Sequence, residues 1–159
     1  MSGMWQVIHS LFAGRAPAPV VPSSRISIVG LVVSEPDKRV LRTISGRMPV
    51  DMHFAESCEE ALASAIQLVA PVILFDRDWP APDWRVTVER LAATPQGACI
   101  ILTSGVADDY LWQELIRRGG YDILAKPLRT DDVARVLMLA LSYWRATERP
   151  TVPSSISRR

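Results

Sequence analysis

The stretch VILFDRDWPAPD, residues 72–83, gives the clearest indication of the fold. It opens with an apolar run that ends at Asp76, and Pro80 and Asp83 follow four and seven positions later. A short apolar run of this kind is typical of a parallel strand that helices cover on both faces. In open α/β sheets, ligands bind outside the carboxyl ends of the strands. We therefore expect the chemistry of this chain to lie around Asp76.

The alternation of a short apolar run with a longer helical stretch occurs five times. We predict strands over 26–33, 50–55, 71–76, 98–103 and 121–126, and helices over 36–46, 57–69, 84–93, 107–118 and 131–146. Alternating βαβ units produce a parallel sheet with right-handed crossovers. The pattern thus predicts a doubly wound, five-stranded parallel sheet in a three-layer α/β/α arrangement.

Local signals mark several helix ends. Ser57 and Thr130 each precede acidic residues, as expected where a helix begins. Gly119 and Gly120 follow the fourth predicted helix, and glycine readily takes the left-handed conformation that ends many helices. These signals support the predicted boundaries.

The predicted domain spans residues 24–147, and the segments on either side differ from it. Residues 1–23 begin with an apolar-faced segment that has the spacing of a short helix, formed by Trp5, Ile8, Leu11 and Phe12. The Pro- and Ala-rich stretch AGRAPAPVVPSS follows as a linker. This segment is interpreted either as a flexible end or as a docking or dimerising helix. Residues 148–159 lack periodicity and are expected to form a tail.

Composition and charge limit the classes of function. The 159 residues, 48% hydrophobic and 22% charged, suit one globular domain. A formal charge of +1 gives no broad electrostatic reason for direct nucleic-acid binding. No apolar run approaches the ~20 residues that span a bilayer, and the first residues do not resemble a secretory signal. Cys58 and Cys99 lack metal-binding spacing. We expect a cytoplasmic protein with reduced thiols.

Polar residues follow four of the five predicted strands. Because the carboxyl ends of parallel strands meet at the same end of a sheet, these residues should lie close together. They are Ser34 and Glu35 after the first strand, Asp76 and Asp78 after the third, Thr103 and Ser104 after the fourth, and Lys126 and Pro127 after the fifth.

Three of these strand ends resemble those of bacterial response-regulator receiver domains, the CheY-like superfamily of two-component signalling. VILFDRDWPAPD resembles the segment around the family's phosphoacceptor. GGYDILAKPL resembles the fifth-strand ending with its Lys-Pro pair, and ILTSG places a hydroxyl at the end of the fourth strand. The resemblance covers roughly residues 24–147 and implies a flavodoxin-like (βα)5 fold.

The resemblance also implies a role for each site residue. Asp76 would be the phosphoacceptor, Lys126 would pair with one phosphoryl oxygen, and Thr103 would donate a hydrogen bond to another. Mg²⁺ would be held by Asp76, Glu35 and the backbone carbonyl of Asp78. The phosphate adds about −1.5 to −2 charges and would shift a two-state arrangement of loops and helices.

The metal site departs from the family's pattern. Receivers usually carry two adjacent acids after the first strand, whereas this chain has Ser34 in the first place and Glu35 in the second. Glu35 could still bind Mg²⁺, and Asp37 or Asp78 could assist through water. We therefore expect a weakened Mg²⁺ site.

The hydroxyl and switch positions also depart from the pattern. The spacing from Thr103 to Lys126 is one residue longer than in the family, which makes Ser104 an alternative for the functional hydroxyl. At the switch positions stand Thr103 and Ile123, and Ile123 replaces the customary aromatic residue. Trp84 stands where a small glycine is usual.

One function and two alternatives follow. In the first, a histidine kinase or phosphotransfer protein phosphorylates Asp76 of a stand-alone receiver, which signals by conformational change and is not an enzyme beyond its self-phosphorylation. The alternative is a pseudo-receiver, a phosphorylation-independent protein-interaction module. A metal-dependent phosphatase or hydrolase, suggested by the Asp76-x-Asp78 pair, is less favoured because the other strand ends carry hydroxyls and an amine.

The last predicted helix indicates a partner surface. Beyond its expected core positions it carries Met138 and Leu139, which add apolar bulk on other faces. In receivers the fourth and fifth helices with the fifth strand commonly form a dimer or output face. We therefore predict a homodimer through 107–118, 121–126 and 131–146.

Overall fold

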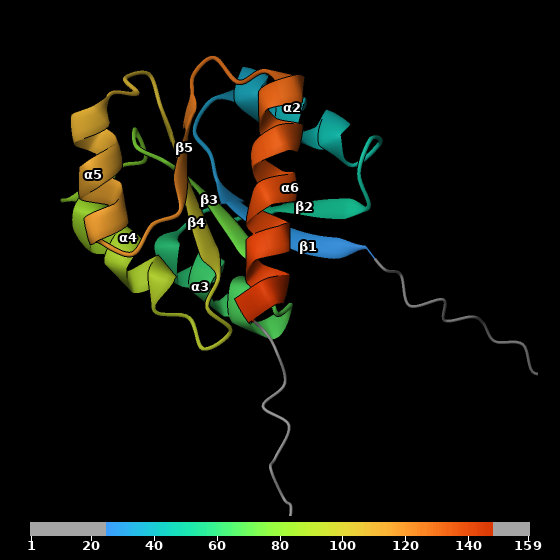
Figure 1. Ribbon diagram of the computed structural model, residues 1–159, viewed down its shortest axis with the longest axis horizontal. Helices are drawn as coiled ribbons and strands as arrows, with labels where there is room; N and C mark the ends of the chain where they lie inside the picture. Colours follow the sequence, from blue (N-terminus) through green and yellow to red (C-terminus); the bar gives the residue numbers. More distant parts are fainter. Residues whose placement is uncertain (1–24, 148–159) are drawn as a thin grey trace, which may run out of the picture.

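The computed structural model describes residues 25–147, and the predicted N-terminal segment and tail lie outside this range. Five strands and five helices alternate along it (Figure 1). They are β1 (Ile26–Leu31), α2 (Glu35–Ile44), β2 (Val50–Phe54), α3 (Cys58–Gln67), β3 (Val72–Asp76), α4 (Trp84–Ala92), β4 (Cys99–Ser104), α5 (Asp109–Arg117), β5 (Asp122–Ala125) and α6 (Thr130–Thr147). Each predicted element is confirmed, and no boundary shifts by more than two residues.

The strands form one parallel sheet in the order β2-β1-β3-β4-β5. Strand β3 lies at its centre, between β1 and β4. The predicted doubly wound flavodoxin-like sheet is therefore confirmed. The chain order also changes direction between β1 and β3, and such switch points are where α/β sheets bind ligands at their carboxyl end.

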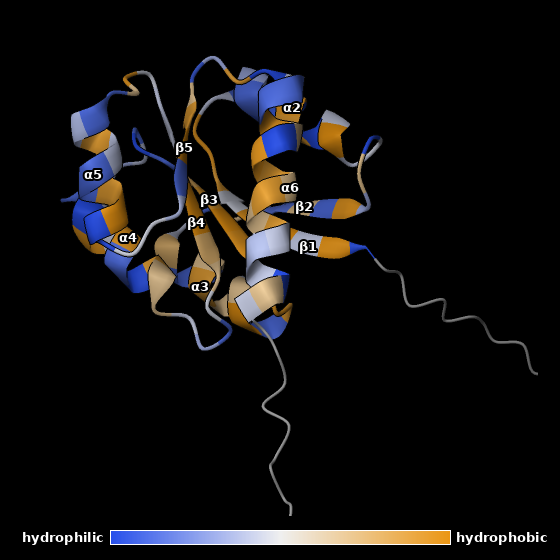
Figure 2. Ribbon diagram, in the orientation of Figure 1, coloured by the Kyte–Doolittle hydropathy of each residue, from blue (hydrophilic) through white to orange (hydrophobic). Residues whose placement is uncertain are grey.

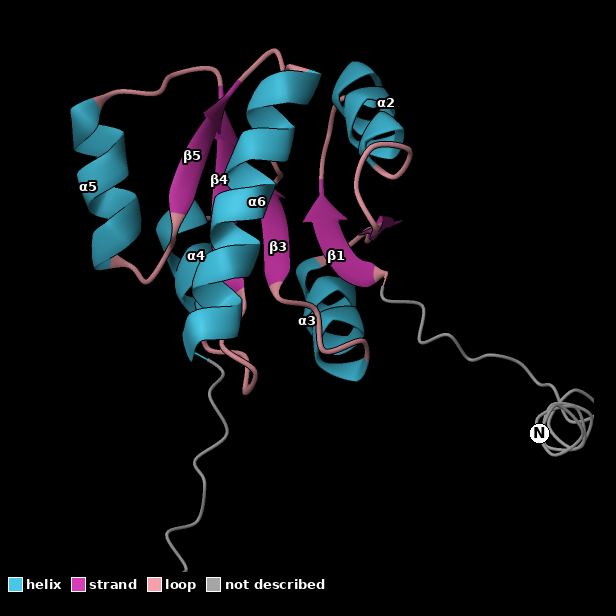
Figure 3. Ribbon diagram, turned by 45° about the vertical axis from the view of Figure 1, so that its right-hand side comes forward, coloured by secondary structure: helices cyan, strands magenta, loops and turns pink. Residues whose placement is uncertain are grey.

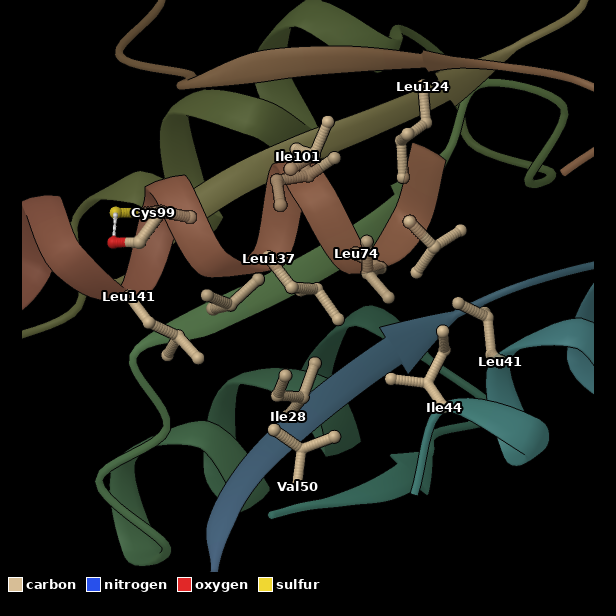
Figure 4. Packing of buried hydrophobic residues seen from close by; sticks show 14 of the residues in the cluster. Ile28, Leu41, Ile44, Val50, Leu74, Cys99, Ile101, Leu124, Leu137 and Leu141 are labelled. Atoms are coloured by element: carbon tan, nitrogen blue, oxygen red, sulfur yellow. Dashed lines mark hydrogen bonds between the residues drawn. The ribbon is translucent and has the colours of Figure 1, made fainter. Parts of the chain in front are cut away.

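The sheet separates two apolar cores because successive strand residues point to opposite faces. In β3, Val72 and Leu74 belong to one core, whereas Ile73 and Phe75 belong to the other. Helices α2 and α6 cover the first face, where Leu41 and Leu137 pack on the strands (Figure 4). Helices α3, α4 and α5 cover the second face. The strands are accordingly apolar along most of their length in Figure 2.

Helix starts follow the predicted chemistry. Ser57 caps α3 by accepting a hydrogen bond from the Glu60 backbone amide, and Ser34 caps α2 in the same way through Asp37. Thr130, which was predicted to precede the last helix, is instead the first residue of α6. Gly119, which follows α5, has a φ of +92°, the left-handed conformation predicted there.

The helices of residues 25–147 include none with the length and apolar character that crossing a bilayer requires.

Candidate functional site

Asp76 is the last residue of β3, and its carboxylate is held from several sides. Oδ1 accepts hydrogen bonds from Lys126 Nζ at 2.8 Å and from the Asp78 backbone amide at 3.0 Å. Oδ2 accepts from the backbone amide of Val33 at 3.2 Å. The residue has no exposed surface. A buried charge needs this number of donors to offset its lost hydration.

Lys126 reaches the carboxylate from the end of β5. Its ammonium contacts Asp76, lies 3.1 Å from Asp78 Oδ2 and 4.0 Å from Asp37 Oδ2. Partial burial lowers the pKa of Lys126, but hydrogen bonds and charge interactions with Asp76 and Asp78 outweigh it, so the net pKa lies above the ordinary value. Lys126 is therefore a fixed positive charge at neutral pH, as pairing with a phosphoryl group requires.

Asp37, for which only a water-mediated contact to a metal was predicted, lies directly beside Lys126. It lies in the first turn of α2 and is only 5% exposed. Its Oδ1 accepts a hydrogen bond from the Leu128 backbone amide at 3.2 Å, and its Oδ2 faces Lys126. The pattern Ser34-x-x-Asp37 resembles a capping box, and this signal could have placed Asp37 one turn into the helix, near the strand ends.

Glu35 does not join this group. It is the first residue of α2, and its carboxylate pairs with Arg42 at 2.8 Å on the exposed surface. The hydrogen bond to Arg42 lowers the pKa of Glu35. Ser34 also turns its hydroxyl to the helix, where it accepts from the Asp37 amide at 3.3 Å. Of the two acids that follow the first strand, Asp37 and not Glu35 is therefore the one that faces Lys126.

The two candidate hydroxyls occupy different environments. Thr103 is the register partner of Asp76 in the neighbouring strand β4. Its Oγ1 is buried and has no hydrogen-bond partner among the described residues. Ser104 Oγ, in contrast, accepts from the Val106 backbone amide at 3.1 Å. Within residues 25–147, Thr103 therefore has an unused donor beside Asp76, whereas Ser104 already stabilises the loop after β4.

The remaining singled-out residues surround this group. Ile123 packs against the core under α3, α4 and α5, as do Trp79 and Trp84. Tyr121 lies on the other face and stacks on Tyr143 with ring centroids 5.3 Å apart. Tyr121 and Ile123 therefore pack in different cores, on opposite faces of the sheet.

The donor set can be tested against Mg²⁺. No three His, Cys, Asp or Glu side chains within residues 25–147 are grouped so as to hold a metal by themselves. Mg²⁺, however, usually keeps several waters and takes one or two carboxylates. Three carboxylates, from Asp37, Asp76 and Asp78, contact or face the single ammonium of Lys126. This excess of negative oxygen donors fits a weak, largely hydrated cation site.

No family model and no curated protein matches the chain. Solved structures do match it. The signal receiver domain of an HD domain-containing protein from Pseudomonas fluorescens has a TM-score of 0.69 at 22% identity, over 85% of this chain and 100% of the other. The receiver domain of a modulated diguanylate cyclase from Desulfovibrio desulfuricans gives 0.64 at 23%, over 77% and 98%. Chemotaxis protein CheY4 of Vibrio cholerae gives 0.64 at 18%, over 74% and 99%. The chain thus has the fold of CheY-like receiver domains.

Proposed function

We propose that this chain is a response-regulator receiver domain in which Asp76 accepts a phosphoryl group from a histidine kinase or phosphotransfer protein in the cytoplasm. The observation that carries the proposal is the 2.8 Å contact between Asp76 Oδ1 and Lys126 Nζ, together with the hydroxyl of Thr103 on the next strand, which has no partner within residues 25–147. Phosphoryl transfer needs a carboxylate nucleophile, a permanently charged amine to pair with the phosphoryl oxygens, and a hydroxyl that can donate a hydrogen bond to them.

The transfer forms one bond and breaks one. An oxygen of Asp76 attacks the phosphorus of the donor's phosphohistidine, the new oxygen–phosphorus bond replaces the nitrogen–phosphorus bond, and the leaving imidazole nitrogen takes up a proton. Asp76 has no exposed surface, so Lys126 must first move away from Oδ1. The displaced ammonium then pairs with a phosphoryl oxygen, and Thr103 donates to another.

A divalent cation would complete this site. Bound Mg²⁺ would neutralise charge on the phosphoryl oxygens. Asp76 and Asp37 are the side chains we propose as its carboxylate ligands, with the backbone carbonyl of Asp78 as a third oxygen. Glu35, the acid first expected here, is engaged by Arg42 on the surface.

The experiment is phosphorylation of the full chain by a small-molecule phosphodonor with Mg²⁺, followed by intact mass measurement. We expect one added phosphoryl group on the parent and none on Asp76→Asn. Asp83→Asn is the matched control because asparagine also caps helices, and it should be phosphorylated like the parent. An unmodified parent, or an Asp76→Asn variant that still gains the group, would overturn the assignment.

A second candidate is the pseudo-receiver, which binds a partner without phosphate. The full burial of Asp76 and the outward position of Glu35 favour it. An unmodified parent that also shows no change of tryptophan fluorescence with beryllofluoride and Mg²⁺ would support this function in place of phosphorylation.

We also propose that the domain forms a homodimer through α5, β5 and α6. These three elements lie side by side in Figures 1 and 3. Large apolar side chains are exposed on them, namely Trp112 and Ile116 on α5 and Leu139 and Tyr143 on α6. Burial of such side chains is the main driving force of association.

A further inference from the structure

A groove lies at the amino end of the sheet, the end opposite to Asp76. It has a volume of about 310 Å³ and lies between the start of β1, the loop after α3 and the last turns of α6. In Figure 3 the end of α3 and the last turns of α6 lie toward the lower end of the sheet, where the strands begin. Its lining includes Arg25, Ile26, Leu68, Val69, Leu141 and Trp144. A second hollow of about 210 Å³ shares Ile26 and Leu141 with it and extends to Met48 and Met138.

Large apolar side chains are exposed around this groove. Val69 is 52% exposed, Met138 60% and Leu68 38%. Single exposed apolar residues are ordinary, whereas a group of them around one depression indicates a binding surface.

Val69 also has an unfavourable backbone conformation. It directly follows Leu68, the C-cap residue of α3, and has a φ of +49°. Glycine is usual at this position because a β-branched side chain is strained in the left-handed region. Two backbone hydrogen bonds close the end of α3 in this conformation, from the Val69 amide to the Ile66 carbonyl at 3.2 Å and from the Ala70 amide to the Ala65 carbonyl at 2.8 Å. The helix cap therefore accounts for the backbone conformation, and it leaves an apolar Val69, 52% exposed, at the edge of the groove, where a partner can cover it.

The chain itself supplies a segment of suitable chemistry. Arg25, the first described residue, lines the groove, so the preceding residues start there. Residues 5–12 contain no Asp, Glu, Lys or Arg and carry the helix-spaced apolar side chains of Trp5, Ile8, Leu11 and Phe12. The linker of residues 13–24 can extend roughly 40 Å, which is ample for a groove that begins at its end. Residues 148–159 offer only two aliphatic side chains, Val152 and Ile156, and two prolines.

We propose that residues 5–12 dock on this groove of the same chain. Trp5, Ile8, Leu11 and Phe12 would cover Leu68 and Val69 and reach toward the last turns of α6. A short linker holds a tethered segment at an effective concentration of about millimolar, so that a weak contact is enough to populate the docked state. The docked segment would lie at the end of the sheet away from the phosphoacceptor.

Hydrogen exchange of the full chain, followed by mass spectrometry, tests this proposal. In the parent, the amides of residues 5–12 should exchange about tenfold more slowly than in Leu11→Ser, as for a docked state populated roughly ten to one. Val69→Asn should abolish the protection as well. Asparagine tolerates the left-handed backbone without the strain of valine, so this variant is expected to fold. The control Val106→Asn, at an exposed residue after β4, should keep the parent's protection.

Three results would overturn the proposal. The first is full-rate exchange of residues 5–12 in the parent, and the second is protection that Val69→Asn leaves unchanged. The third is protection that weakens on dilution, which would assign the groove to the segment of a second copy. None of these results depends on phosphorylation of Asp76.

Discussion

The Nζ atom of Lys126 lies 2.8 Å from Oδ1 of Asp76, although 50 positions separate the two residues in the chain. The contact connects β5 to β3 across the intervening strand β4. The Asp76 side chain has no exposed surface, and that of Lys126 is 14% exposed. In such a desolvated pair, the loss of one partner leaves a charge that water cannot stabilise.

Lys126→Met should therefore destabilise the domain strongly. The Asp76 carboxylate would keep only the amide donors of Val33 and Asp78. We expect the free energy of unfolding at neutral pH to fall by roughly 3 kcal/mol. Urea unfolding measures this value. Lys38→Met, which removes an ammonium 5.8 Å above the Phe54 ring, is the control and should cost less than about 1 kcal/mol. Equal losses of unfolding free energy in the two variants would contradict the role assigned to the Lys126–Asp76 pair.

Thr103→Val should slow phosphorylation without lowering the stability of the domain. The Thr103 hydroxyl is buried and has no hydrogen-bond partner in the described part of the chain, so its replacement by a methyl group should leave stability unchanged or raise it by about 1 kcal/mol. Phosphorylation by a small phosphodonor should become slower, because a donor to the phosphoryl oxygens is lost. Ser104→Ala, measured in parallel, removes the hydrogen bond to the Val106 amide. A slower rate only in Ser104→Ala would assign the functional hydroxyl to Ser104.

Acid should weaken the connection between α4 and α5. Glu114 accepts hydrogen bonds from Arg85 and Arg117, each at 3.0 Å. The hydrogen bond from Arg85 lowers the pKa of Glu114 below its ordinary value of 4.5, against an opposing effect of burial. A lowered pKa means that this stabilisation is present above the unfolded-state pKa and is lost as the pH falls through the folded-state pKa.

The stability difference between the parent and Glu114→Gln should accordingly shrink as the pH drops below about 5. Urea unfolding over a pH series measures this difference. In an Arg85→Gln background, the same glutamate substitution should show a smaller pH dependence. An identical pH profile in both backgrounds would exclude Arg85 as the main cause.

Leu139→Asp should prevent the proposed dimer. Leu139 is 54% exposed and lies one helical turn before Tyr143, which stacks on Tyr121 next to β5. A carboxylate at this position would be desolvated in an α5–β5–α6 interface. Static light scattering at increasing concentration should show association of the parent and a monomeric variant. Met138→Asp is the matched control, because Met138 lines the hollow at the amino end of the sheet.

The fold followed from the sequence because its two periodicities are strong and alternate regularly. The largest error in a strand concerned the end of β1, which was predicted to reach residue 33 and ends at Leu31. Val32 and Val33 favour a strand by composition. The Val33 amide, however, donates to Asp76 Oδ2 instead of to a neighbouring strand. The side chain of Asp76, 43 positions further along the chain, therefore ends the strand pairing of β1. The residues around Val33 alone do not indicate this contact.

The sequence predicted which strand ends meet at the site, but it did not predict which acid after the first strand faces it. Asp76, Asp78 and Lys126 were expected to converge, and they contact one another. The acid of the first βα unit was assigned to Glu35 because Glu35 stands in the second place of the adjacent acid pair that receivers usually carry after the first strand. The helix begins at Glu35, so its side chain turns to the surface and Asp37 turns inward. Which of two acids faces a pocket depends on where the helix starts, to within one residue.

Because Ser34 caps α2 through its side chain, the charge at this position can change without loss of the cap. Its hydroxyl accepts a hydrogen bond from the Asp37 amide, and aspartate serves as a helix cap about as well as serine does. Replacing Ser34 by aspartate would add an acid at the carboxyl end of the sheet without depriving α2 of its first hydrogen bond. A single amino-acid substitution can thus add or remove this charge while α2 keeps its cap, so the acidity of the pocket can change independently of the stability of the helix.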